Sequence, residues 1–224
     1  MKNQVNESAN NPNNSLKQLF RIIYLNSFEL ISLNIFFLIS CIPILTIPNA
    51  ICSLTKTNLD LSENIGANPL KKYWKSFFTF NKRWLLSGFS YITAFFLLSY
   101  GLAIYLSTNT SATLFWIFCG FNILALALLI MVGFYLFPLL IGTELDQKTV
   151  WKHAFGMVVV EMKSTFALFS VIAALWILCI RFFRSTWIIF ILIAFSLSSL
   201  IVIFYTRRWL AKYFPQFRNA DSND

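Results

Sequence analysis

The sequence contains few charged residues: 12% of its 224 residues are Asp, Glu, Lys or Arg, whereas a soluble domain carries about 25%. The shortage is concentrated in three blocks without any charge, which are 84–143, 164–180 and 185–206. A helix needs about 20 apolar residues to cross a membrane, so these blocks exclude an ordinary soluble domain and predict transmembrane helices. A closed β-barrel is excluded because the blocks lack the alternation of barrel strands.

Groups that carry catalytic chemistry are also scarce. There is one histidine, His153, which excludes a two-histidine metalloprotease motif and a histidine-rich zinc site. No Gly-rich phosphate loop is present, so the chain is not the ATPase of a pump. The four cysteines lie in apolar stretches and are not spaced as a disulfide framework. We therefore expect no enzymatic activity, no metal and no cofactor.

The carboxylates lie outside the apolar blocks, apart from Glu29 at the mouth of the first one. Proton-coupled carriers generally place ionisable groups within the membrane, and their absence from the later blocks argues against that class. A lipid-modifying enzyme would have to use Glu29, His153 or Glu161 at a headgroup site, and we keep it as a third hypothesis.

The hydropathy pattern predicts an all-α, polytopic transmembrane helical bundle with interfacial amphipathic helices. We expect a disordered tail over 1–14, where six asparagines occur, a transmembrane domain over 15–205, and a basic, then polar, cytoplasmic tail over 206–224. About five spans are predicted within the domain, near 29–52, 84–106, 112–142, 164–180 and 187–205.

The first predicted span is interrupted by the sequence IPILTIPNA at 42–50, which contains Pro43 and Pro48. Proline removes an amide donor and clashes with the preceding turn, so we expect a kink or a break here. A broken helix frees carbonyls that could line a cavity together with Thr46 and Asn49. Two topologies remain open: a kinked full crossing, or a segment that returns to the side it came from. In both, the basic loops place the C-terminus in the cytoplasm.

Residues 68–84, NPLKKYWKSFFTFNKRW, predict an amphipathic helix that Asn68 can cap and Pro69 can begin. Aromatic residues form one face and basic residues the other, as in helices that lie on anionic membranes or bind a partner helix. The candidate contacts are Lys71, Lys72, Lys75, Lys82 and Arg83. Similar interfacial helices are expected from Ser15 and over 147–162.

Three sequence segments, YLNSFELISLNIFFLISCIPILTIPNAICSLTK, WKSFFTFNKRW and FPLLIGTELDQKTVWKHAFGM, occur in an order and spacing that resembles the YesL-like family. These are small bacterial integral membrane proteins that form a domain of unknown function, and the similarity covers roughly 15–205. The resemblance implies about five spans and no established catalytic residue. Family members are often encoded near carbohydrate ABC uptake systems, so it also implies a link to sugar import. The loop TKTNLDLSENIGANPL lacks the arginine-rich stretch that members often carry there, so a partner of that loop would differ.

These observations favour a non-enzymatic accessory protein of a transport (carbohydrate uptake) or sensing system in the cytoplasmic membrane. Its expected partners are anionic lipid headgroups and an ABC permease or another membrane complex, with no nucleic acid. The alternative is a small uniporter or channel-like carrier that uses the proline-broken first helix.

Overall fold

The computed structural model describes residues 21, 23–25, 27–63, 68–79, 81–107 and 113–214, without the side chains of 63, 113, 114, 182–193 and 208. This part of the chain is all-α, as predicted. Its elements are α3 (Ser27–Ser40), a 3₁₀ turn (Ile44–Thr46), α4 (Ile47–Glu63), α5 (Pro69–Phe78), α6 (Lys82–Ser107), α7 (Thr113–Gly142), α8 (Gln147–Val160) and α9 (Met162–Tyr213). The expected tail 1–14, the first part (15–20) of the expected interfacial helix from Ser15 and the final residues 215–224 lie outside the described residues.

Among the described residues, three helical segments are long and apolar enough to cross a membrane: Lys82–Ser107, Phe115–Gly142 and Met162–Arg181. They correspond to the second, third and fourth predicted spans. Helix α3 has 14 residues and is about 21 Å long at 1.5 Å per residue, which is less than the hydrocarbon thickness of about 30 Å.

The first predicted segment, 29–52, consists of two helices. Helix α3 ends at Ser40, and the chain passes through the 3₁₀ turn before α4 begins at Ile47. Pro48 is accommodated in the first turn of α4, where its missing amide donor is not needed. Helix α4 then continues to Glu63, through residues that we had expected to form a loop. The prolines therefore separate two helices instead of bending one.

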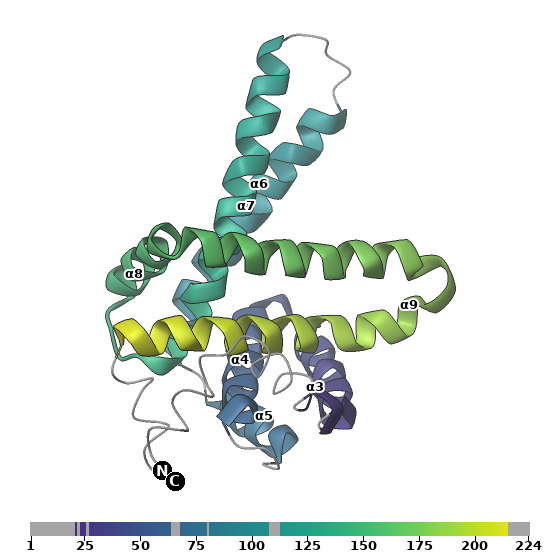
Figure 1. The fold of residues 1–224 in the computed structure, drawn as a ribbon, viewed down its shortest axis with the longest axis vertical. Coiled ribbons are helices and arrows are strands. Elements are labelled where there is room, and N and C mark those ends of the chain that lie inside the picture. Colours follow the sequence, from purple (N-terminus) through teal and green to yellow (C-terminus); the bar gives the residue numbers. More distant parts are fainter. Residues whose placement is uncertain are drawn as a thin grey trace.

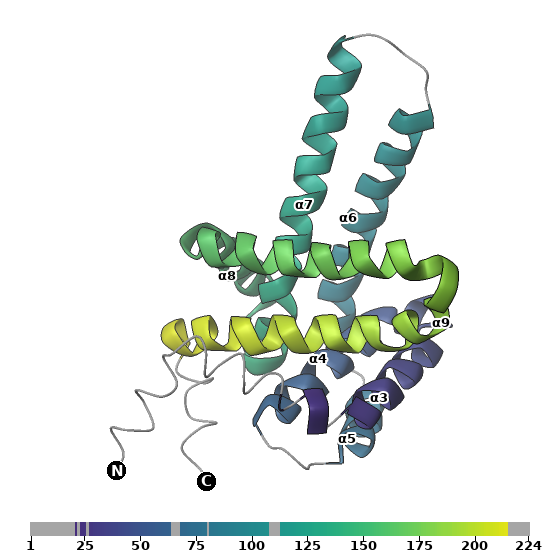
Figure 2. The ribbon, with the colours of Figure 1, turned by 45° about the vertical axis from the view of Figure 1, so that its right-hand side comes forward.

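Helices α6 and α7 form a hairpin that projects from the rest of the molecule (Figures 1 and 2). We call 92–107 and 113–128 the far half of this hairpin. In it, large apolar side chains such as Phe96, Tyr100 and Phe121 are exposed. In the near half, residues 131–140 of α7 are all buried, so one helix changes from an exposed to a buried environment along its length.

Helix α9 folds back on itself, and its two arms run crosswise to the hairpin (Figures 1 and 2). A straight helix of 52 residues would be about 78 Å long, yet the Lys212 ammonium at its end lies 3.8 Å from the Glu161 carboxylate before its start. The rings of Trp176 and Phe195, one on each arm, are 5.1 Å apart. The expected tail from residue 206 begins as helix, because α9 continues to Tyr213.

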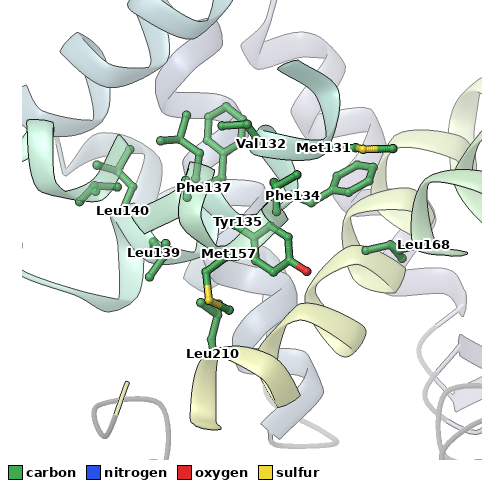
Figure 3. Packing of buried hydrophobic residues seen from close by; sticks show 14 of the residues in the cluster. Met131, Val132, Phe134, Tyr135, Phe137, Leu139, Leu140, Met157, Leu168 and Leu210 are labelled. Carbon is green, nitrogen blue, oxygen red and sulfur yellow. The ribbon is translucent and has the colours of Figure 1, made fainter. Parts of the chain in front are cut away.

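The main core surrounds the near half of α7 (Figure 3). Tyr135 is 1% exposed, and its hydroxyl lies 2.8 Å from that of Thr165 on the first arm of α9. Met157 of α8 and Leu210 of the second arm pack against the same cluster. A smaller cluster joins α3, α4 and α5 around Leu33, Leu54 and Tyr73. Together these clusters hold α4 and α5 beside the base of the hairpin.

Candidate anion-binding site between α4 and α5

Residues of the proline break, 42–50, form hydrogen bonds that connect neighbouring helices. The Thr46 hydroxyl donates to the carbonyls of Ser40, at 2.6 Å, and Pro43, at 2.7 Å. The amide of Asn49 donates to the carbonyl of Phe77 at the end of α5. These bonds satisfy acceptors that the ends of α3 and α5 would otherwise leave open.

Pro48 packs directly on helix α6 at Gly88. A Cβ atom placed on Gly88 would lie 2.5 Å from the Cβ of Pro48, so only glycine allows this approach. Both Pro48 and Gly88 are buried. The break therefore docks the start of α4 onto the base of the hairpin. Of the four residues proposed for a break or cavity, Thr46, Pro48 and Asn49 make defined structural contacts, and Pro43 accepts a bond from Thr46.

The five predicted basic contacts separate into three environments. Arg83 donates from its guanidinium to the carbonyls of Thr143, at 3.2 Å, and Leu145. It therefore holds the turn after α7 against the start of α6. Lys71 and Lys82 are exposed on the surface. Lys72 and Lys75 line a cavity of about 280 Å³ between α4 and α5.

This cavity brings together residues from two helices. Lys56, Thr57 and Asp60 come from α4, one helical turn apart, while Lys72, Lys75, Ser76 and Thr79 come from α5 and the residue after it. Positions separated by three or four residues share one helical face, so each helix supplies a polar face to the same cleft.

Positive charge predominates in the cavity. The Lys72 ammonium lies 3.4 Å from the Asp60 carboxylate, in a pair whose side chains are 39% and 31% exposed. Lys56 lies 5.9 Å above the ring of Trp84 at the start of α6. Three ammonium groups therefore line the cavity with one carboxylate, which leaves an excess of two positive charges. An aqueous anion is the ligand that this charge favours.

The neighbouring side of α5 is anchored in the protein. Tyr73 is fully buried and stacks on Phe77 with 6.1 Å between ring centroids. Burial raises the pKa of the Tyr73 phenol to about 12. Tyr73 therefore remains neutral at physiological pH. The predicted helix start is confirmed at Pro69, and Asn68 occupies the cap position without a side-chain cap bond. The prediction of one helix over 68–84 is wrong, because α5 ends at Phe78 and α6 begins at Lys82.

Lys56 and Asp60 were missed because they lie in the stretch that we read as a loop. The spacing of 56, 57 and 60 is the signal that could have identified them, since it places these residues on one helical face. These residues share a cavity with Lys72 and Lys75 because α4 packs on α5. The spacing of residues within α4 cannot predict that packing.

The three candidate catalytic residues are not assembled into one site. His153 lies edge-on to the ring of Phe214, 5.4 Å between centroids. Glu161 accepts a hydrogen bond from Tyr213 at 3.2 Å and pairs with Lys212. Glu29 lies in the first turn of α3. Among the described residues, no group of three His, Cys, Asp or Glu side chains could hold a metal ion.

Comparisons with known proteins identify no relative: no family model, no curated protein and no solved structure matches the chain. The resemblance to the YesL-like family accordingly stays a prediction from its sequence motifs.

Proposed function

We propose that this chain is a multi-pass, non-enzymatic membrane protein that assembles with a transport or sensing complex of the cytoplasmic membrane. The observation that carries the proposal is the α6–α7 hairpin, whose far half exposes apolar side chains and contains no charged residue. Such a surface suits hydrocarbon or another apolar helix and not water.

The distribution of charge supports one orientation for the hairpin. Lys82 and Arg83 stand at the start of α6, and Lys148 and Lys152 follow the end of α7. The far half between them has none. Because cytoplasmic loops are enriched in Lys and Arg, the base of the hairpin lies on the cytoplasmic side in our proposal, together with the cavity between α4 and α5.

An accessory role is supported by what the polar groups do. Glu161 and His153 are engaged by the end of α9, and the break residues join α3, α5 and α6. The alternative carrier needs the break to line a path for substrate, whereas Pro48 and Asn49 are committed to packing. We therefore favour the accessory role over the carrier. A link to carbohydrate uptake depends on the family resemblance alone.

Photo-crosslinking in native membranes tests this proposal. A photoreactive amino acid replaces Phe121, which is 71% exposed in the far half, and a matched control replaces Lys71 at the base. We expect Phe121 to give one reproducible adduct with a transport or sensor subunit that the Lys71 position does not give. Adducts with lipid alone, combined with sugar uptake by liposomes that contain only this protein, would support the carrier instead.

A further inference from the structure

The cavity between α4 and α5 has the properties of a built site and not of a scattered basic surface. Thr57 is 1% exposed and donates its hydroxyl to the carbonyl of Ser53 at 2.8 Å. Thr79 donates to the carbonyl of Lys75 at 2.7 Å. Both threonine hydroxyls are thus engaged within their own helical segments, which fixes the walls of the cavity.

Ser76 is the unengaged polar group of this cavity. It is 6% exposed, and its hydroxyl oxygen is buried without a hydrogen-bond partner among the described residues. A buried hydroxyl without a partner is costly, so a ligand that accepts its proton would stabilise the protein. Ser76 lines the cavity beside Lys72 and Lys75, which places one neutral donor among the ammonium groups.

The carboxylate in the cavity neutralises only part of the charge. Asp60 pairs with Lys72, whereas the described residues give Lys75 no carboxylate partner. Because the Lys72–Asp60 pair is partly exposed, it contributes little on its own, and Lys72 can turn towards a stronger acceptor. An anion with several oxygens can accept from Lys56, Lys72, Lys75 and Ser76 together, as phosphate groups do.

The cavity lies close to a helix that can cross the membrane. Its Lys56 lies 5.9 Å from the ring of Trp84, a buried residue in the first turn of α6. A volume of about 280 Å³ exceeds the roughly 30 Å³ of a water molecule several-fold, so a phosphate with part of its substituent has room.

We propose that Lys56, Lys72, Lys75 and Ser76 form a binding site for a phosphate group between α4 and α5. The phosphate belongs either to an anionic phospholipid headgroup or to a free phosphate in the cytoplasm. This proposal goes beyond the accessory role, since binding requires no partner protein and is measured on the isolated chain.

The test measures binding to the purified full-length protein with two probes, inorganic phosphate and nanodiscs that contain phosphatidylglycerol or only phosphatidylcholine. We expect Lys75→Gln to weaken binding of the effective probe about tenfold, or about 1.4 kcal/mol, since it removes a charge-assisted hydrogen bond. Lys71→Gln removes the same charge from the exposed face of the same helix, and we expect it to change binding less than about twofold.

A second variant separates binding from folding. Asp60→Asn removes the carboxylate that competes for Lys72, so we expect it to tighten phosphate binding, a gain that misfolding cannot produce. Displacement of phosphatidylglycerol by inorganic phosphate assigns the site to free phosphate, and binding of phosphatidylglycerol without such displacement assigns it to the lipid. Equal losses in Lys75→Gln and Lys71→Gln, or weaker binding in Asp60→Asn, would overturn the proposal.

Discussion

Helix α4 and the far half of the α6–α7 hairpin show opposite relations between polarity and exposure. Helix α4 buries Asn49, Ser53, Thr57 and Asn58, each at most 1% exposed. The far half instead exposes aromatic and aliphatic side chains. In water, the burial of polar groups in α4 and the exposure of apolar side chains in the far half would both be unfavourable. It is consistent with lipid around the hairpin, because lipid tails are as apolar as a leucine side chain.

Several buried polar groups of α4 make local or interhelical hydrogen bonds, whereas the Ser53 hydroxyl has no partner among the described residues. Thr55 and Thr57 donate to carbonyls one turn earlier, at 2.8 Å each. Asn58 donates to the carbonyl of Ser196 on the second arm of α9, at 3.3 Å. Inside a membrane, lipid tails are as apolar as the side chains, so apolar contact alone does not drive helices together. Hydrogen bonds and close packing hold them together instead.

The largest loss of stability that we expect comes from filling the space at Gly88, where α4 packs closely on α6. Gly88→Leu places a side chain where Pro48 already lies, so we expect a loss of about 3 kcal/mol or failure to fold. Gly120→Leu is the control, because a Cβ at Gly120 meets nothing within 4 Å in the far half. Thermal unfolding in mild detergent measures both. Equal stability of the two variants would mean that α4 does not dock through this contact.

A smaller loss is expected when the turn after α7 is released from α6. Arg83→Gln removes the guanidinium that donates to the carbonyls of Thr143 and Leu145, and we expect a loss of about 2 kcal/mol in the same assay. Lys82→Gln removes a neighbouring exposed charge and should leave the unfolding temperature within error. If Lys82→Gln has the larger effect, the role of Arg83 as a link between the helices is wrong.

The smallest expected effect compares one side chain from each region. Asn58→Ala loses a buried hydrogen bond and should cost about 1–2 kcal/mol. Phe121→Ala removes a larger side chain that is mostly exposed, so we expect a loss of less than about 0.5 kcal/mol in detergent. The reverse order of the two losses would show that the far half is packed against protein in the purified state.

The sequence predicts the long apolar helices well, because the uncharged blocks encode them locally. It also places Pro69 at a helix start. We did not predict that 53–63 is helical, because we read this polar stretch as a loop although its residues have an amphipathic pattern. Lys56 lines the same cavity as α5, and the two arms of α9 contact each other, only because residues distant in the sequence pack together. Local sequence patterns do not encode such contacts.

The central claim is that the far half of the hairpin lies in the membrane while the cavity between α4 and α5 remains in water. Spin labels at Leu97 and at Lys71, each introduced into a variant without the four native cysteines and reconstituted in liposomes, test it most directly. Leu97 is 68% exposed in the far half, so we predict that its label is relaxed by oxygen and protected from a water-soluble nickel complex. The Lys71 label should show the opposite pattern. A Leu97 label that is as accessible to nickel as the Lys71 label would contradict the account.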